Sequence, residues 1–257
     1  MSGYAIFMKT VHALGLFPYA RRLRIWRDHH SAGGIRKHAE LRAFYSQFVS
    51  AGDLCFDVGA NVGDRAEIFC ELGARVVCVE PQADCVAVLQ RRFRNAPVSI
   101  VQKALGEKEG TAELHVCAYN PGLTTLSDRW IHHGRYSGDY EWRRTVPIPM
   151  TTLDALVAEH GTPRFCKIDV EGFEESVLKG LSRPIPFLSF EYHAELFEEF
   201  ARCVDRLSAI GEPSFNAALR DDVRMMLPAW ASAANLTSAL RQLPDPGTWG
   251  DVYVKFS

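Results

Sequence analysis

Four acidic residues stand at or near the ends of apolar segments in this 257-residue sequence. They are Asp57, Glu80, Asp169 and Glu191. Charged residues are rare inside buried parallel strands, whereas the ligands of an open parallel sheet bind outside the carboxyl ends of its strands. We therefore expect these acids to meet at one edge of a sheet and to form a polar ligand site there.

The first of these acids precedes a loop with two glycines, in the sequence FDVGANVG at positions 56–63. Gly59 and Gly63 have no Cβ atom, so the backbone can turn sharply and approach a ligand closely. The start of the helix that follows offers unpaired N–H groups. Because the Asp57 carboxylate would attract an ammonium group and repel a pyrophosphate, the loop favours a nucleoside cofactor with an amino-acid tail, such as S-adenosylmethionine.

The second acid, Glu80, follows Gly63 by 17 residues. A carboxylate at the end of the second strand can accept hydrogen bonds from both hydroxyls of a ribose, and it disfavours a 2′-phosphate. A nicotinamide-dependent oxidoreductase would show the same alternation of strands and helices, but its fingerprint requires a glycine where this chain has Asn61. Asp57 and Glu80 together favour S-adenosylmethionine over a dinucleotide.

Short apolar runs alternate with helical patterns along most of the chain. We predict core strands at 55–58, 75–81, 98–102, 165–169 and 187–193, helices at 35–50, 62–72, 81–94, 152–160, 173–181 and 194–210, and later strands near 224–227 and 251–256. Such alternation builds an α/β fold with a parallel sheet and right-handed crossovers. The segment at about 110–150 breaks the pattern, with strand candidates at 112–117 and 145–150 around an aromatic loop, and is predicted to be an insertion.

The first 50 residues differ in composition from the rest. They contain eight Lys and Arg residues and two acidic residues, although the whole chain has a net charge of −2. We predict a helical, basic N-terminal segment over 1–50 and one main domain over 51–257. Apolar residues at 4–17 follow a helical stripe that is expected to pack on the domain or on a second subunit, and contact of 1–27 with a membrane surface is the less favoured alternative.

The seven cysteines form no Cys-x-x-Cys pair, and three of them, Cys55, Cys78 and Cys166, fall in apolar strand-like runs. Such cysteines behave as small buried hydrophobes, so a reduced, cytoplasmic location is expected. No signal peptide or membrane-spanning segment is predicted, because Lys9 and His12 interrupt the apolar N-terminus. The mildly acidic overall charge predicts no nucleic-acid partner.

Several stretches of the sequence resemble the FkbM family of methyltransferases. They are FDVGANVG at 56–63, VEP at 79–81, TLD at 152–154, KIDVEGFE at 167–174, VLKG at 177–180, and Glu191. The resemblance covers roughly residues 54–193, and KIDVEG is its most specific part. It implies a Rossmann-like class I methyltransferase fold, with about seven mostly parallel strands, helices on both faces and an antiparallel last strand. It also implies S-adenosylmethionine as the methyl donor and transfer mostly to hydroxyl oxygens of sugars, polyketides or related metabolites.

The same resemblance implies where the cofactor would lie. The methionine tail would pass over the loop at 57–63, with Asp57, Gly59, Asn61 and Gly63, and the ribose would lie on Glu80. The adenine would lie beside Pro81 and the turn that contains Gln102 and Ala104. Gln102 stands where many methyltransferases carry an aspartate for the adenine amino group, and its amide oxygen could still accept a hydrogen bond.

Methyl transfer to a hydroxyl requires an in-line approach and removal of a proton. We predict His193 as the general base and Glu191, two residues away on the same strand face, as the group that orients it. Asp169 and Glu171 are expected to line the cleft near the transferred methyl group. The four side chains could also bind a divalent ion, but carboxylates in a cofactor cleft also bind sugar hydroxyls, and no metal is predicted. Glu174 is expected to be solvated.

Aromatic residues in the insertion are predicted to recognise the acceptor. They are Trp130, Tyr136, Tyr140 and Trp142, and arginines lie between them. Aromatic faces stack on sugar rings, and arginines bind carboxylates or phosphates. The insertion could instead be a surface flap or a contact in a homodimer. We predict an O-methyltransferase that modifies a sugar, a glycan or another small hydroxylated metabolite. A non-catalytic scaffold is disfavoured, because a scaffold has no use for buried carboxylates.

Overall fold

The computed structural model describes residues 31–117, 120–220 and 222–256. The predicted helix at 4–17 and the basic cluster after it lie outside the described residues. The described elements are α3 (Ala32–Tyr45), β1 (Leu54–Val58), α4 (Asp64–Glu71), β2 (Arg75–Val79), α5 (Ala83–Arg92), β3 (Val98–Val101), β4 (Ala104–Leu105), β5 (Gly110–Cys117), η1 (Pro121–Leu123), α6 (Asp128–His133), β6 (Trp142–Thr151), α7 (Leu153–His160), β7 (Phe165–Ile168), α8 (Glu174–Lys179), β8 (Phe187–His193), η2 (Ala194–Leu196), α9 (Phe197–Ile210), β9 (Pro213–Leu219), α10 (Ala233–Arg241) and β10 (Trp249–Phe256).

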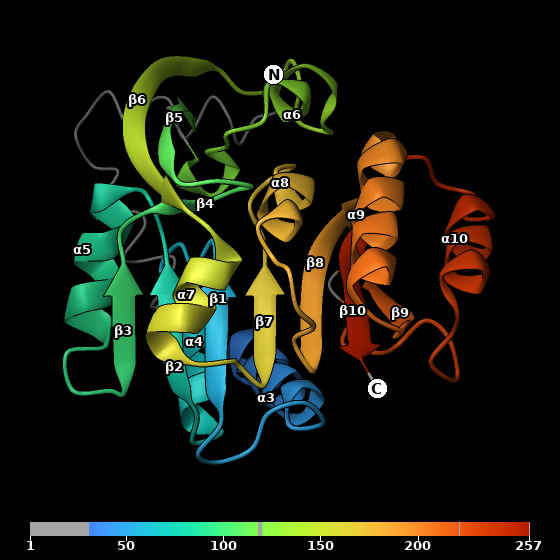
Figure 1. Ribbon diagram of the computed structural model, residues 1–257, viewed down its shortest axis with the longest axis horizontal. Helices are drawn as coiled ribbons and strands as arrows, with labels where there is room; N and C mark the ends of the chain where they lie inside the picture. Colours follow the sequence, from blue (N-terminus) through green and yellow to red (C-terminus); the bar gives the residue numbers. More distant parts are fainter. Residues whose placement is uncertain (1–30, 118–119, 221, 257) are drawn as a thin grey trace.

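Seven of the strands form one sheet with the order β3-β2-β1-β7-β8-β10-β9. The pairs from β3 to β8 are parallel, and β10 is antiparallel to both β8 and β9. This topology confirms the predicted mostly parallel, seven-stranded sheet with an antiparallel last strand (Figure 1). Because β1 lies between β2 and β7, the strand order reverses beside β1, which is where ligands bind in open α/β sheets.

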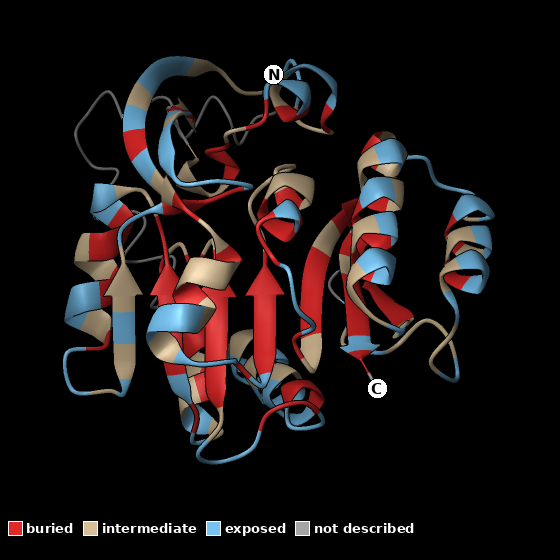
Figure 2. Cartoon of the chain, viewed as in Figure 1, coloured by how far each residue is buried: buried red, intermediate tan, exposed pale blue. Residues whose placement is uncertain are grey.

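The central strands of the sheet are buried on both faces, as an apolar parallel sheet requires, and the edge strand β3 is partly exposed (Figure 2). Successive side chains of β1 alternate between the faces: Phe56 packs with α7, α8 and α9, whereas Cys55 packs with α3, α4 and α5. Both side chains are fully buried. Full burial of a phenylalanine contributes about 1.5–3 kcal/mol to stability, so the two helical layers hold the strand ends in place.

The described part of the basic N-terminal segment packs on the sheet through α3. The helix begins after Ser31, whose side chain accepts a hydrogen bond from the Gly34 N–H. Its last residue, Tyr45, is buried, and its ring lies edge-on to Phe69 and Phe165, with centroid distances of 5.1 and 5.7 Å. Such aromatic contacts contribute about 0.5–1.5 kcal/mol each beyond burial, which fixes α3 to the domain.

The insertion forms a small separate sheet with the order β4-β6-β5. It lies beyond the carboxyl ends of the parallel strands (Figure 1). Strands β5 and β6 are the two predicted at 112–117 and 145–150, and each is longer than predicted. The hydroxyl of Thr125 donates a 2.7 Å hydrogen bond to the Glu171 carbonyl oxygen, so the insertion is attached to the loop after β7.

The C-terminal prediction was wrong in part. Residues 224–227 form no strand, and the seventh strand of the large sheet is β9. The sequence PSFNAAL of β9 lacks a strong strand pattern, but pairing with β10 satisfies its backbone. The helix predicted from 194 begins at Phe197, after the short turn η2. Among the described residues, no helix has both the length and the apolar character needed to cross a bilayer.

Candidate active site

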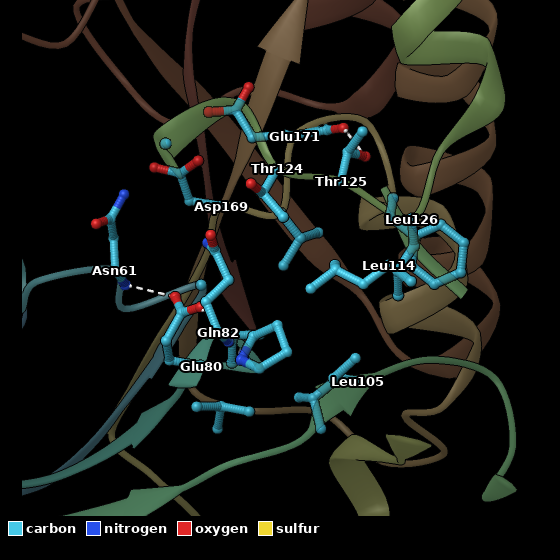
Figure 3. Close-up of a pocket in the computed structure, with 18 of the residues that line it drawn as sticks. Asn61, Glu80, Gln82, Leu105, Leu114, Thr124, Thr125, Leu126, Asp169 and Glu171 are labelled. Carbon is cyan, nitrogen blue, oxygen red and sulfur yellow. Dashed lines mark hydrogen bonds between the residues drawn. The ribbon is translucent and has the colours of Figure 1, made fainter. Parts of the chain in front are cut away.

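A cavity opens at the carboxyl ends of β1, β2 and β7, under the insertion (Figure 3). We call it the first cavity. Its space, including its open mouth, is about 760 Å³, which is within the usual range for small-molecule sites. It is lined by Val58, Gly59, Asn61, Val79, Glu80, Pro81, Gln82, Lys103, Ala104, Leu105, Leu114, Pro121, Gly122, Thr124, Thr125, Leu126, Asp169, Val170, Glu171 and Phe173.

The loop after β1 takes backbone conformations that its glycines allow. Gly59 and Gly63 have φ angles of 81° and 87°, and Asn61 between them has a φ of 49°. A Cβ atom on Gly59 would lie 1.8 Å from the carbonyl oxygen of Asp169, and one on Gly63 would lie 2.4 Å from the Phe93 ring. Both glycines are therefore required by left-handed backbone geometry and by close packing.

Asp57, two residues before Gly59, is buried beneath the glycine loop and contacts the first turn of α4. It is 2% exposed and lines neither this cavity nor the second one described below. Its Oδ2 accepts a 3.1 Å hydrogen bond from the Ala66 N–H in the first turn of α4. Burial raises the pKa of Asp57 to about 6, although the charges of Lys167 and Arg65 oppose the shift. The carboxyl group thus fixes α4 to β1.

Glu80 lines the first cavity and is held by two backbone groups (Figure 3). Its Oε2 accepts from the Asn61 N–H and its Oε1 from the Gln82 N–H, both at 2.8 Å. A carboxylate oxygen has more than one acceptor site, so each oxygen can also accept a ligand hydroxyl. The two N–H groups fix the carboxylate in position before any ligand arrives.

The far end of the first cavity is largely apolar. Pro81 and Ala104, the two residues predicted to lie beside an adenine, are among its lining residues. Gln102 is exposed and does not line it, so the cavity gives no support to the predicted contact with Gln102. The predictions also missed lining residues from the insertion, namely Leu114, Pro121, Thr124, Thr125 and Leu126. Nothing in their local sequence marks them, because only the folding of the insertion over the sheet brings them there.

The KIDVEG segment supplies a buried ion pair at the end of β7. The ammonium group of Lys167, a residue that is 3% exposed, lies 2.6 Å from Asp169 Oδ2 and 3.8 Å from Asp251 Oδ1. Burial raises the pKa of Asp169, but the charge of Lys167 outweighs this effect and the net pKa is lower than usual. Asp169 is therefore ionised and fixed beside the glycine loop.

Two glutamates lie close to Asp169. Glu171, in the loop after β7, has a left-handed φ of 55°, and Glu191 belongs to β8. Burial, with the charges of Glu191 and Asp169, raises the pKa of Glu171 well above its usual value. Burial, with the charges of Asp169 and Glu174, does the same for the pKa of Glu191. Acids forced together in this way are typical of functional sites.

His193 meets Glu191, as their spacing on one strand face predicts. Its Nε2 lies 3.0 Å from Glu191 Oε2. The imidazole is 3% exposed, its ring centroid is 4.4 Å from that of Trp130, and burial lowers its pKa. His193 lines neither cavity, so an acceptor in either cavity would meet Glu191 or Asp169 first.

A second cavity of about 530 Å³, including its open mouth, lies on the other side of Asp169. It is lined by Lys37, Leu41, Phe44, Tyr45, Arg65, Asp169, Glu191, Arg220, Asp222, Val223, Trp249, Gly250, Asp251 and Tyr253. Asp169 is shared by the two cavities. The sequence did not indicate this cavity, whose walls come from α3, α4 and the C-terminal strands.

Glu174 corrects one expectation. It was predicted to be solvated, but it is 5% exposed. Its Oε1 accepts hydrogen bonds from the N–H groups of Val170 and Gly172, at 3.0 and 3.3 Å. The side chain therefore holds the loop that carries Glu171. A glutamate early in a helix satisfies such N–H groups well, which is the signal that the sequence offered.

The aromatic residues of the insertion pack on one another. Trp130 is 1% exposed, and Tyr136, Tyr140 and Trp142 are partly buried around it. None of the four lines either cavity. The prediction that they stack on the acceptor is therefore wrong for Trp130, whose ring is covered by protein. The other three likewise contribute to the core of the insertion.

The chain is similar in sequence or fold to several known methyltransferases. Hexuronic acid methyltransferase AglP of Haloferax volcanii is 28% identical over 147 residues, which are 55% of this chain and 56% of AglP. The match thus spans little more than half the length of that relative. Among solved structures, an O-methyltransferase from Bacillus cereus in complex with SAH (S-adenosylhomocysteine) aligns with a TM-score of 0.46 and 10% identity over 100% of this chain and 92% of that one.

A precorrin-6y C5,15-methyltransferase from Geobacter metallireducens also aligns, with a TM-score of 0.46 and 10% identity over 85% of this chain and 87% of that one. Residues 57–229, more than half of the chain, match the sequence model of the family described as Methyltransferase FkbM domain. They include the glycine loop, Glu80, the KIDVEG segment and Glu191. The chain therefore belongs to the FkbM methyltransferases, which have the class I fold and use S-adenosylmethionine.

Proposed function

We propose that the protein transfers a methyl group from S-adenosylmethionine to a hydroxyl oxygen of a sugar, a glycan or a related hydroxylated metabolite. One observation carries the proposal: Asp169 lines both cavities. The first cavity has the features of a nucleoside site, and the second holds polar and charged side chains. Donor and acceptor would then meet beside Asp169.

The residues of the first cavity fit the donor. Glu80 is fixed by two backbone N–H groups at the place where a ribose would lie. Ala104, Leu114 and Leu126 offer apolar contacts to a flat base, and Gly59 and Asn61 of the glycine loop line the same cavity as Asp169. When bound, S-adenosylmethionine supplies a methyl group on a positively charged sulfur.

The acidic group at the ends of β7 and β8 would handle the acceptor proton. A hydroxyl must approach the methyl carbon in line and lose its proton. Of the four residues predicted for this role, Asp169, Glu171 and Glu191 reach a cavity and His193 does not. We infer that a carboxylate receives the proton and that His193 acts through Glu191, whose Oε2 is 3.0 Å from its Nε2.

The second cavity suits an acidic sugar. Three basic residues, Lys37, Arg65 and Arg220, line it beside four acids, Asp169, Glu191, Asp222 and Asp251. Arginine binds carboxylates well, and carboxylates accept hydrogen bonds from sugar hydroxyls. Trp249 offers an aromatic face in the same wall, and Arg135 stacks on that ring at 4.2 Å from the centroid. The name of the Haloferax volcanii relative, a hexuronic acid methyltransferase, supports the same substrate class.

The rival interpretations gain no support. The family to which the chain belongs argues against a nicotinamide-dependent oxidoreductase. The non-catalytic scaffold would leave the raised pKa values of Glu171 and Glu191 without a use, since clustered buried acids destabilise a fold.

The experiment combines the full-length chain, S-adenosylmethionine labelled with ¹³C in its methyl group, and a panel of uronic acid glycosides with matched neutral glycosides. We expect a ¹³C methoxy product from at least one uronic acid glycoside, with release of S-adenosylhomocysteine. Uronic acids carry both hydroxyl and carboxylate oxygens, and alkali distinguishes the products. An alkali-stable ether supports the proposal, and an alkali-labile ester would show that the carboxylate, not a hydroxyl, is the acceptor.

A further inference from the structure

We propose that Glu171, Glu191 and His193 bind a divalent metal ion at the junction of the two cavities. Their ligand atoms all lie within 4.8 Å of one another. Glu171 lines the first cavity and Glu191 the second, so an ion between them would sit where donor and acceptor meet. The binding of the ion is independent of the proposed function, but the catalytic role suggested for it rests on that function.

The spacing of the side chains matches a coordination sphere. His193 Nε2 and Glu191 Oε2 are 3.0 Å apart. Two ligands at a right angle on an ion with bonds of about 2.1 Å are separated by about 3.0 Å, and two opposite ligands by about 4.2 Å. The His193–Glu191 pair has the spacing of two neighbouring ligands. The 4.8 Å limit on the separations of the three residues exceeds the separation of opposite ligands, about 4.2 Å, by about 0.6 Å, so a small movement of the side chains would bring all three onto one octahedral ion.

Three polar atoms of the site have no hydrogen-bond partner among the described residues. Glu191 Oε2 and both ring nitrogens of His193 are buried and make no hydrogen bond, although Nε2 and Oε2 are close. Only 3% of the His193 surface is exposed to solvent. Buried polar groups in proteins are nearly always satisfied, and a metal ion would satisfy a carboxylate oxygen and an imidazole nitrogen together.

The fold holds the three ligands in place. Glu191 and His193 are two residues apart on β8 and project from one face. Glu171 is held in a left-handed conformation by a hydrogen bond from Thr125 to its carbonyl oxygen. Non-glycine residues in this conformation are uncommon and concentrate at functional sites. The Trp130 ring covers His193 on the side of the insertion.

Charge also favours a cation here. Lys167 neutralises Asp169 at 2.6 Å, which leaves the carboxyl groups of Glu171 and Glu191 near each other and near Glu174. Two carboxylates and one imidazole suit a first-row divalent ion such as Mn²⁺, because the oxygens alone would suit Mg²⁺ or Ca²⁺ while imidazole favours transition metals.

Such an ion would change the roles assigned above. An acceptor hydroxyl bound to it would have a lowered pKa, and His193 would be a ligand of the ion instead of a group that acts through Glu191. With Glu171 and Glu191 on the ion, Asp169 would be the carboxylate left to receive the hydroxyl proton. The methyl group would then pass to an oxygen that the ion holds in line.

The test is a titration of the metal-free, full-length protein with Mn²⁺ at neutral pH, followed by the loss of the free-ion signal in electron paramagnetic resonance. We expect one saturable site per chain. Replacement of a supporting residue around a metal weakens binding about 10–100-fold, so Glu171→Gln, Glu191→Gln and His193→Ala should each weaken it at least about tenfold. The control Glu198→Gln, an exposed acid of α9, should bind as the wild type does.

Absence of saturable Mn²⁺ binding by the wild type, or equal affinity in all four variants, would overturn the proposal. Thermal unfolding of each variant checks folding, and Mn²⁺ should raise the melting temperature of the wild type and of Glu198→Gln only. Calorimetry with S-adenosylhomocysteine on the same metal-free protein separates the two claims. If the protein binds S-adenosylhomocysteine but not Mn²⁺, only the metal site is rejected. If it binds Mn²⁺ but not S-adenosylhomocysteine, only the proposed function is rejected.

Discussion

Gly59 and Asp169 lie so close together that a Cβ atom on Gly59 would be 1.8 Å from the Asp169 carbonyl oxygen. Gly59 follows β1, Asp169 follows β7, and the two strands are neighbours in the sheet. The glycine loop and the KIDVEG segment, which are more than 100 residues apart in the chain, are thus fitted to each other. The donor site depends on this contact between two backbones.

Gly59→Ala should disrupt that contact. The left-handed φ costs about 1–2 kcal/mol for alanine, and the overlap with Asp169 should add about 1–3 kcal/mol. Gly52→Ala is the matched control, because Gly52 has a φ of +88° and open space around its Cβ position. Urea unfolding should show a larger loss for Gly59→Ala, together with weaker binding of S-adenosylhomocysteine. Equal losses in the two variants would contradict the packing argument.

Glu80→Gln should weaken the donor site without unfolding the protein. One charged acceptor of ribose hydroxyls is lost, which is worth about 1.5–3 kcal/mol, or roughly 10–150-fold in affinity. Calorimetry with S-adenosylhomocysteine measures the change. Glu107→Gln, an exposed acid after β4, serves as the control. If Glu80→Gln binds as tightly as this control, Glu80 does not hold the ribose.

The sequence predicted the parts of this site that are local. The glycine loop, Glu80 and the KIDVEG segment each follow a strong apolar strand, and parallel strands bring their ends to one edge. The strand at 224–227 was wrong and β9 was missed, because the pairing of β9 with β10 decides its conformation and the local pattern does not.

Asp57 should make stability depend on pH. Its pKa is raised from 3.8 to about 6 in the folded protein. The folded state therefore holds the proton of Asp57 more tightly than the unfolded state does. Protonated Asp57 stabilises the fold below about pH 4, and this stabilisation is lost as the pH rises through about 6. At about 1.4 kcal/mol per pKa unit, the loss is about 3 kcal/mol.

Urea unfolding between pH 4 and pH 7 tests this, with Asp57→Asn as the comparison. The difference in unfolding free energy between the two proteins should shift by about 3 kcal/mol in favour of the variant as the pH rises. The comparison removes the contributions of other acids, which are common to both proteins. A difference that does not vary with pH would show that Asp57 has an ordinary pKa.

Glu174 should stabilise the loop that carries Glu171. Glu174→Ala leaves the N–H groups of Val170 and Gly172 without their acceptor, and a buried unsatisfied group costs about 1–3 kcal/mol. Glu174→Gln keeps one acceptor oxygen and should lose less. Urea unfolding measures both variants against Glu198→Ala on the exposed side of α9. An alanine variant as stable as that control would refute the support role.

The residues that sequence reasoning placed wrongly depend on the tertiary arrangement. Trp130 and its aromatic neighbours have the composition of a sugar-binding surface, but folding of the insertion buries Trp130 against His193. Gln102 is exposed one residue beyond β3 and does not line the first cavity, although Lys103 and Ala104 do. The second cavity could not be predicted, because α3, α4 and β10 come together only in the folded protein.

A crystal structure of the chain with S-adenosylhomocysteine tests the central claim, that donor and acceptor meet beside Asp169. We predict the ribose on Glu80, the adenine against Ala104 and Leu126, and the sulfur at the junction of the two cavities beside Asp169. The acceptor side of the sulfur should face Glu191. A sulfur that points away from Asp169, or a ligand confined to the second cavity, would contradict the account.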